Sequence, residues 1–248
     1  MTGETLLITR AKGDEASLAA ALQAQGYRII HEPLAEIFLR HNERQALHNA
    51  LLSEPDAVIA TSRHGIHALA LLSDVRDTYL WCVGEATARA AHSLGFTRVG
   101  VGGGNVATLI ETIAHGYDAG SRFLYISGAE VRVDLPASLA THGMETERLV
   151  LYETIAAERL SDTLAEQLRR KQLDGVTFFS RSAAQLFTAL LAQAALPQAA
   201  ANLHVFCVSA AVAEPLGAAW KGIHVSREPT LASVVECVDN VFSYGRRN

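Results

Sequence analysis

Cysteine is scarce in this chain of 248 residues, and long hydrophobic runs are missing from it. The three cysteines, Cys82, Cys207 and Cys237, show no C-x-x-C spacing, which argues against a zinc knuckle and against a disulfide framework. No run approaches the roughly 20 apolar residues that a membrane-spanning helix needs. The opening MTGETLLITR has neither a basic segment nor a long apolar stretch, so it predicts no signal peptide. We therefore expect a soluble cytoplasmic protein.

Positive charge is also in short supply. The net charge of −5 and the pI near 6.1 argue against a protein that binds nucleic acid or an anionic membrane surface. A small anionic ligand remains compatible with this composition, because a local site can be positive on an acidic protein. With 49% apolar and 19% charged residues the chain is globular, and its length fits one large domain or two of ordinary size.

Several motifs of catalytic and metal sites are absent as well. The glycines of GVGGGN (100–105) lack the G-x-G-x-x-G order of a dinucleotide loop, and no Ser-His-Asp order or nucleophile elbow occurs. His64 and His67 share one face of a predicted helix, but no third ligand is evident, so no metal site is predicted. Glu85 and Glu130 follow predicted strands without an evident partner and are interpreted as solvated carboxylates.

Short apolar runs alternate with stretches of helical period, which is typical of an open parallel sheet covered by helices on both faces. Strands are expected at 5–9, 28–32, 56–61, 79–83, 98–101, 122–126, 145–152, 175–179, 203–208 and 223–226. Helices are expected at 14–25, 63–73, 85–94, 106–114, 130–142, 160–171, 181–195, 210–219 and 231–243. The sequence therefore predicts an α/β fold.

Three segments of the sequence occur twice. The repeated pairs are 56–63 with 174–181, 80–96 with 205–220, and 122–153 with 5–36. The first pair is an apolar strand that begins at Asp and ends in Ser-Arg in both copies.

The order of these copies predicts two domains, because one set is contiguous and the other is divided between the chain ends. One domain would be continuous, about 38–152, and the other would combine 1–36 with 155–248. The chain would cross between them near 31–39 and 148–156, and two extended crossings side by side would form a hinge, where ligand sites often lie.

Small, hydroxylic or cationic residues follow most of the predicted strands. These candidate binding residues are Thr9, Arg10, Ser62, Arg63, Gly84, Ser127, Gly128, Ser180, Arg181 and Ser209. Ligands of parallel sheets bind beyond the carboxyl ends of the strands, and hydroxyl, amide and guanidinium donors suit an anion. Ser62 and Ser180 have an alternative interpretation as helix N-caps. The arginines that follow them could equally be ordinary solvated side chains.

Tyr152 lies in the second predicted crossing and would face a cleft between the domains. A phenol there could donate a proton to a leaving oxygen, or hydrogen-bond a ligand. The alternative is an aromatic side chain that only packs at a hinge.

Taken in order, six stretches resemble the uroporphyrinogen-III synthase family. They begin LLITRAKGDE, ATSRHGIHAL, CVGEATARAA, RFLYISGAEV, TFFSRSAAQL and VSREPTLASV, and together they cover nearly the whole chain. The resemblance implies two flavodoxin-like domains with parallel sheets, joined by a two-stranded β-ladder. Nothing in the sequence demands a partner subunit, so we expect a monomer.

The resemblance also implies a reaction. Hydroxymethylbilane, a linear tetrapyrrole with eight carboxylates, loses water and closes through a spiro intermediate to uroporphyrinogen III with ring D inverted, on the route to haem and sirohaem. Neither a metal nor an organic cofactor is implied. By the same resemblance, Tyr152 corresponds to the proton donor, Thr87 belongs to the V-G-x-A-T stretch, and Ser209 and Val212 stand where many members carry Gly and Thr.

A second hypothesis, from another class, is a non-catalytic two-domain protein that binds or senses a small anion, because similar folds serve as receptors. A phospho-receiver or flavin module fits less well. Its strand ends would need clustered Asp, or a phosphate loop after the first strand, and this sequence has Thr9, Ser62 and Ser180 at those ends.

Overall fold

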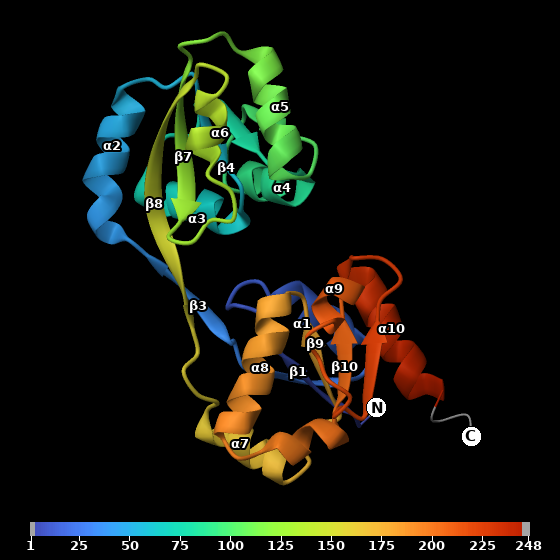
Figure 1. The fold of residues 1–248 in the computed structure, drawn as a ribbon. Coiled ribbons are helices and arrows are strands. Elements are labelled where there is room, and N and C mark those ends of the chain that lie inside the picture. Colours follow the sequence, from blue (N-terminus) through green and yellow to red (C-terminus); the bar gives the residue numbers. More distant parts are fainter. Residues whose placement is uncertain (1–2, 245–248) are drawn as a thin grey trace. The chain divides into compact units, whose positions relative to one another are not determined.

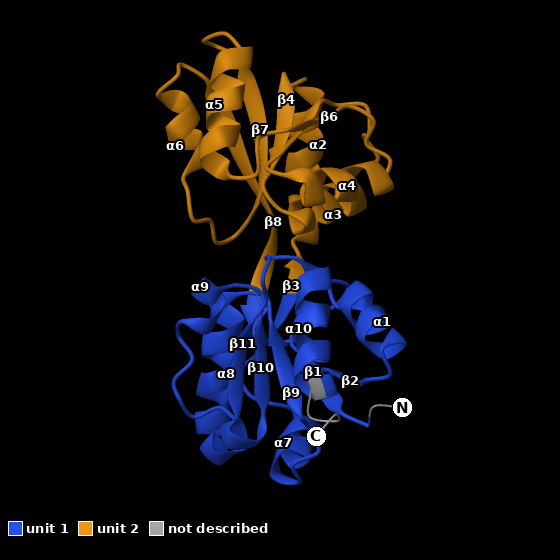
Figure 2. Cartoon of the chain, turned by 90° about the vertical axis from the view of Figure 1, so that its right-hand side faces the viewer, with its two compact units in different colours: residues 1–36, 155–248 blue, residues 37–154 orange. Residues whose placement is uncertain are grey.

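The computed structural model describes residues 3–244, and Figure 1 shows their helices and strands. The chain forms two compact units, which Figure 2 shows in different colours. Unit 1 combines residues 1–36 with 155–248, and unit 2 is the continuous segment 37–154. Each unit is an α/β fold built on one sheet that is dominated by parallel strand pairs.

Unit 2 contains a six-stranded sheet in the order β3-β8-β7-β4-β5-β6. Its strands are β3 (Ala35–Leu39), β4 (Ala57–Ala60), β5 (Leu80–Cys82), β6 (Val99–Val101), β7 (Arg122–Gly128) and β8 (Glu145–Ala156). Its helices are a 3-10 turn (His41–Glu43), α2 (Arg44–Leu52), α3 (Arg63–Leu72), α4 (Glu85–Ser93), α5 (Val106–Gly116) and α6 (Leu135–Ala140). In the sequence, β3 and β8 run past the boundary of the unit.

Unit 1 contains a five-stranded sheet in the order β11-β10-β9-β1-β2. Its strands are β1 (Thr5–Ile8), β2 (Arg28–His31), β9 (Gly175–Phe178), β10 (His204–Cys207) and β11 (Gly222–Val225). Its helices are α1 (Ala16–Ala24), α7 (Asp162–Arg169), α8 (Arg181–Gln193), a 3-10 helix (Pro197–Asn202), α9 (Ala210–Ala213) and α10 (Leu231–Tyr244).

Both faces of each sheet are covered by helices because successive residues of a strand point to opposite sides. In unit 2, Val58 and Ala60 pack with α2, α3 and α4, whereas Ala57 and Ile59 pack with α5 and α6. In unit 1, Val176 and Phe178 of β9 face α7 and α8, while Leu6 of β1 faces α1 and α10. This two-sided burial explains why the strands read as continuous apolar runs in the sequence.

The two sheets repeat one arrangement. The order β2-β1-β9-β10-β11 of unit 1 corresponds to β8-β7-β4-β5-β6 of unit 2, so each repeated sequence segment occupies the same place in its sheet. The internal repeat predicted from the sequence is confirmed in this sense. Unit 2 is continuous and unit 1 is divided because segment 5–36, the copy of 122–153, precedes unit 2 in the chain.

The aspartate that opens each Ser-Arg strand makes the same contact in both units. Asp174 Oδ2 accepts a hydrogen bond from the backbone N–H of Thr5 at 2.8 Å. Asp56 Oδ2 accepts one from the backbone N–H of Arg122, also at 2.8 Å. Each aspartate thereby links the start of its strand to the start of the neighbouring strand. The repeated aspartate therefore helps to set the register of the two strands.

Sequence reasoning missed β3 and α2. The segment 31–39, expected as one extended crossing, contains the end of β2 and all of β3, separated by residues 32–34. Helix α2 was not predicted because only Leu47 and Ala50 of its nine residues are buried, which leaves little apolar periodicity to detect.

Two predicted helices were too long. The helix expected at 130–142 is the six-residue α6, whose N-cap Asp134 accepts a hydrogen bond from Ala137 N, with Pro136 in the first turn. The helix expected at 210–219 ends at Ala213, because Pro215 cannot continue it and restricts the residue before it.

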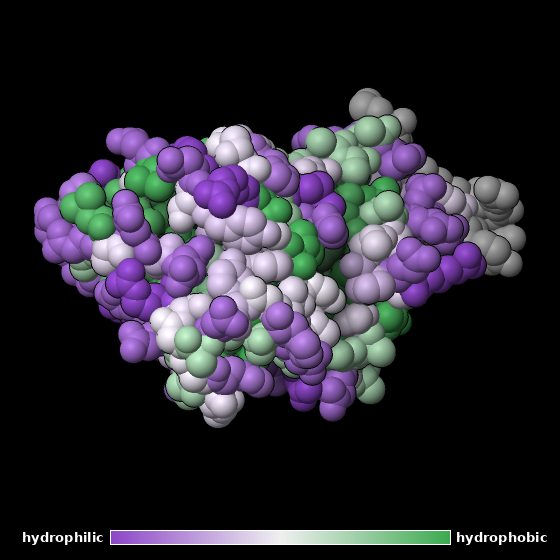
Figure 3. All heavy atoms as spheres, turned by 90° about the horizontal axis from the view of Figure 1, so that it is seen from above, coloured by the Kyte–Doolittle hydropathy of each residue, from purple (hydrophilic) through white to green (hydrophobic). Residues whose placement is uncertain are grey.

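In the described part of the chain, no helix is long and apolar enough to span a membrane. Figure 3 shows one face of the molecule, on which hydrophilic and intermediate residues separate smaller hydrophobic patches.

Polar contacts join the two chain segments of unit 1. Glu32, just after β2, accepts hydrogen bonds from Ser161 N at 2.8 Å and from Ser161 Oγ at 2.9 Å. Ser161 in turn caps α7 by accepting from Leu164 N at 3.1 Å. Tyr27 adds a second link, because its hydroxyl donates to Asp239 in α10 at 3.0 Å.

We expect Glu32→Ala to lower the free energy of unfolding of unit 1 by about 2 kcal/mol, the range for hydrogen bonds to a charged group. Urea denaturation measures the change. Glu158→Ala, at an exposed position, is the matched control and should leave the stability within about 0.5 kcal/mol of the parent protein. Equal stability of the two variants would contradict the prediction.

Candidate functional site

The Ser62 hydroxyl lies at the carboxyl end of β4 and starts α3. Ser62 has an extended backbone, and its Oγ accepts a hydrogen bond from Gly65 N at 3.1 Å. Ser180 does the same at the end of β9, where its Oγ accepts from Ala183 N at 3.1 Å. The interpretation of both serines as helix N-caps is confirmed. The two Ser-Arg sequences thus fix two helix starts, whose first-turn N–H groups favour negative charge.

Tyr152 contacts the Ser62 cap although β7 lies between β8 and β4 in the sheet. It lies in β8 with 9% of its surface exposed, and its hydroxyl is 2.7 Å from Ser62 Oγ. The His64 ring is 6.0 Å from the Tyr152 ring, centroid to centroid. Gly128 makes room for the phenol, because a Cβ at that position would stand 2.8 Å from Cε2 of Tyr152. Sequence reasoning singled out three of these residues, and the fold brings them into contact.

The Tyr152 phenol is a neutral, proton-bearing group. Burial raises its pKa above the ordinary value, and the nearby Tyr125 phenol adds to the rise. The hydrogen bond with Ser62 and a second one from the Gly128 backbone act in the opposite direction and lower the pKa. The site therefore keeps the proton on Tyr152 while holding donors beside its oxygen.

Ser127 is hydrogen-bonded to Arg148, a residue that sequence reasoning missed. Ser127 is 1% exposed, and its hydroxyl donates to Gly128 O at 3.0 Å and accepts from Arg148 Nε at 2.8 Å. The structure thus shows Ser127 as part of an internal network. A half-buried arginine inside an apolar strand, as in ERLVLY, was the signal that could have found Arg148, because a buried guanidinium needs several acceptors.

The remaining candidates of unit 2 lie around the same strand ends. Gly84 holds the N-cap position of α4 with an extended backbone, and its carbonyl accepts from Thr87 N at 3.0 Å. Thr87 is 6% exposed, in the first turn of that helix. Thr61, beside Ser62, pairs its hydroxyl with Tyr125 at 3.2 Å.

In unit 1 the corresponding residues are engaged differently. Thr9 is buried and donates to Thr177 O at 3.0 Å. The Arg10 guanidinium lies 4.5 Å from the centroid of the Phe179 ring and 3.8 Å from Asp14. Ser209 occupies the N-cap position of α9 without a side-chain cap bond.

Arg181 forms an ion pair with Glu214 at 2.9 Å. Both side chains are more than half exposed, at 52% and 64%, and such surface pairs contribute little to stability. Glu214 therefore holds the Arg181 guanidinium only weakly. Arg63, the equivalent residue of unit 2, is half-buried at the start of α3.

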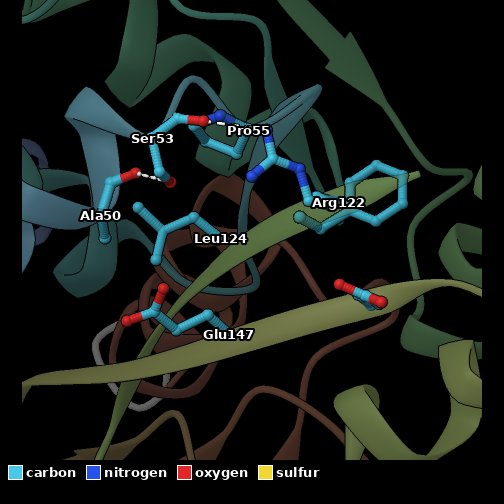
Figure 4. A pocket seen from close by; sticks show the side chains of 8 residues that line it. Ala50, Ser53, Pro55, Arg122, Leu124 and Glu147 are labelled. Atoms are coloured by element: carbon cyan, nitrogen blue, oxygen red, sulfur yellow. Dashed lines mark hydrogen bonds between the residues drawn. The ribbon is translucent and has the colours of Figure 1, made fainter. Parts of the chain in front are cut away.

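The hollow in Figure 4 belongs to the opposite end of the unit 2 sheet. It is lined by Ala50, Ser53, Pro55, Arg122, Phe123, Leu124, Glu145 and Glu147. Arg122 and Glu145 open β7 and β8, whereas Tyr152 lies near the carboxyl ends of the strands. The Arg122 guanidinium donates to the Ser53 carbonyl at 2.9 Å, so it has a structural task. Among residues 3–244, no cluster of three or more His, Cys, Asp or Glu side chains could hold a metal ion.

Comparisons with known proteins identify the family and the fold. The family model described as uroporphyrinogen-III synthase HemD matches residues 16–236, which is most of the chain. The chain belongs to the uroporphyrinogen-III synthase family. This membership makes it an enzyme of porphyrin and tetrapyrrole biosynthesis. No match was found among curated protein sequences.

Two solved uroporphyrinogen-III synthases share the fold at low sequence identity. A mutant enzyme of the extremely thermophilic bacterium Thermus thermophilus aligns with a TM-score of 0.60 and 17% identity, over 97% of this chain and 99% of that one. The uroporphyrinogen-III synthetase of Helicobacter pylori aligns with a TM-score of 0.59 and 16% identity, over 96% and 99%. At these identities the comparison establishes the two-domain α/β fold of the family.

Within this family member, Ser62→Ala is expected to raise the pKa of the Tyr152 phenol further, because one of the two hydrogen bonds that lower it disappears. Carbon-13 NMR of labelled tyrosine, with Tyr152→Phe to identify the signal, measures the titration. A phenol whose folded pKa exceeds the unfolded value, about 10, contributes stability that is complete below pH 10 and lost as pH rises through the folded pKa.

Ser180→Ala is the matched control for this variant. It removes the equivalent cap of α8, so both variants should lose about 1 kcal/mol of stability. Only Ser62→Ala should move the Tyr152 titration, and identical titrations in the two variants would show that the Ser62 contact has no electrostatic role.

Proposed function

We propose that this protein is a uroporphyrinogen-III synthase, which dehydrates and cyclises hydroxymethylbilane to uroporphyrinogen III with inversion of ring D. Family membership supports the substrate class. The observation that carries the proposal is the 2.7 Å contact between the Tyr152 hydroxyl and the Ser62 cap, at the end of the sheet where parallel folds bind ligands.

In the proposed first step, Tyr152 protonates the terminal hydroxyl of the bilane as its C–O bond breaks, so that water leaves and an azafulvene remains. Ser62 supports this step. Its oxygen accepts from Gly65 N at the positive end of α3, so its own hydrogen can point to the Tyr152 oxygen and stabilise the phenolate that forms. The phenol proton then stays available for the leaving group.

The later steps are mainly geometric. The substituted carbon of ring D attacks the electrophilic carbon of the azafulvene to give the spiro intermediate, whose rearrangement inverts the ring, and the last proton lost restores Tyr152. The bilane also closes unaided, but to the other isomer. The protein must therefore hold the chain in one arrangement, which proximity and orientation supply.

We propose that the strand ends of both units bind the eight carboxylates of this substrate. Helix N-termini and arginines supply the donors, and they occur at the same end of each sheet. In unit 2 these are the starts of α3 and α4 with Arg63, and in unit 1 the starts of α8 and α9 with Arg181. Because the ion pair of Arg181 with Glu214 is exposed, a substrate carboxylate can replace Glu214 as the partner of the Arg181 guanidinium.

Freshly prepared hydroxymethylbilane tests the proposal. The products are oxidised to porphyrins and the isomers are separated. We expect isomer III in excess with the protein and isomer I in a blank without it. Isomer I alone in both samples would reject the synthase and leave a non-catalytic protein that binds anionic tetrapyrroles.

A further inference from the structure

The turn after β7 forms one wall of the Tyr152 site. The register between β7 and β8 shifts there, because Ser127 is opposite Val150 whereas Gly128 is opposite Tyr152. Ala129 N donates to Tyr152 O at 2.9 Å, just beyond the shift. A Cβ on Gly128 would stand 2.9 Å from Cζ of the phenol, so the ring packs against bare backbone. The backbone at 127–129 therefore determines where the phenol lies.

Arg148 fixes this stretch of backbone from β8. Its Nε donates to Ser127 Oγ at 2.8 Å, and its Nη2 donates to Gly128 O at 2.9 Å and to Ala129 O at 3.0 Å. Ser127 closes the network by donating to Gly128 O. A planar guanidinium holds several acceptors in a fixed geometry, which a lysine cannot do from one nitrogen.

We propose that Arg148 is a positioning residue for Tyr152: it holds the 127–129 backbone on which the phenol packs and so keeps the Tyr152 hydroxyl on Ser62. The inference rests on the proposed function in one respect, that Tyr152 donates the proton. Arg148 holds the backbone and does not touch the substrate, so it affects the reaction only by setting the position of the Tyr152 hydroxyl. Displacements of about 1 Å can cost a reaction up to about 100-fold in rate.

Arg148→Met tests the proposal through the kinetics. It removes all three hydrogen bonds while keeping an unbranched stem, and we expect kcat to fall by about 10- to 100-fold with KM changed by less than about two-fold. Arg148→Lys keeps the charge without the planar group and should recover only part of the loss. Arg132→Met is the matched control, at an exposed arginine of the following loop, and should react like the parent protein.

Carbon-13 NMR of labelled tyrosine gives a readout that a purely structural role would not change and that needs no substrate. In folded Arg148→Met, the Tyr152 phenol should titrate at a pH different from that of the parent, because a loosened wall changes both the burial that raises its pKa and the hydrogen bonds from Ser62 and Gly128 that lower it. Gly128→Ala, which pushes on the same ring, should also displace the Tyr152 signal. Ser127→Ala removes the hydroxyl that accepts from Arg148 Nε and donates to Gly128 O, and it serves in place of Arg148→Met if that variant does not fold.

The outcomes separate this inference from the proposed function. A displaced Tyr152 signal with reduced kcat supports both. An unchanged Tyr152 signal in folded Arg148→Met overturns the positioning role, whatever happens to turnover. If the parent protein makes no isomer III while Arg148→Met still displaces the Tyr152 signal, the proposed function fails and the positioning of Tyr152 by Arg148 stands.

Discussion

Tyr152→Phe is expected to lower the kcat for isomer III by about 100-fold, the lower end of the range for loss of a general acid. The variant keeps the ring on Gly128 and removes only the oxygen that contacts Ser62, so packing is preserved. We expect KM to change little, because the carboxylate donors at the strand ends remain. Initial rates of isomer formation over a range of bilane concentrations measure both constants.

Tyr117→Phe is the control for this experiment. Its phenol is also in unit 2, and burial raises its pKa as it does for Tyr152, but its hydroxyl accepts from Trp81 Nε1 at 3.2 Å. Tyr117 packs on the α5 face of the sheet, away from the Ser62 cap. It should retain parental kcat. Equal turnover by Tyr152→Phe and the parent would show that another group protonates the leaving hydroxyl.

Phe187→Ala is expected to destabilise unit 1 by about 3–5 kcal/mol, the cost of emptying a buried aromatic site. The Phe187 side chain is fully buried, with ring centroids 5.7 Å from Phe178 and 6.2 Å from Trp220. It links α8 to β9 and to the segment before β11, so few neighbours can move in to fill the cavity.

Thiol labelling in urea measures this loss for each unit separately. Cys207 in unit 1 and Cys82 in unit 2 are both buried, and burial raises the pKa of each thiol to about 12, so neither reacts while its unit is folded. In Phe187→Ala, Cys207 should become reactive at lower urea than in the parent, with Cys82 unchanged. Ile66→Ala, in the unit 2 core, should give the reverse pattern. A joint shift of both thiols in both variants would show that the units unfold together.

The strands and helix caps were readable from the sequence because they depend on neighbouring residues. Strands β4 and β9 are buried at every position and appear as apolar runs, and Ser62 and Ser180 follow them as caps. Helix α2 was not readable, since most of its residues face solvent.

The candidate site was readable only in part because its contacts join distant residues. Tyr152 was predicted as functional, but its partner Ser62 is 90 positions away and reaches it through the sheet order. The role of Arg148 depends on a register shift between β7 and β8, which no local sequence pattern predicts. Ser127 was predicted to bind ligand, and its internal hydrogen bonds emerge only when that shift is known.

The divided unit has a consequence for how the chain is made. Strand β1 leaves the ribosome well before one of its two neighbours, β9, which begins just after Asp174, 169 positions beyond its contact Thr5. All of unit 2 emerges in the interval and can fold as it appears. During that time β1, fully buried in the finished protein, stays exposed to water and to other chains. We therefore expect β1 to need chaperone protection on the nascent chain. We also expect a truncation that removes β9 to prevent residues 5–31 from folding.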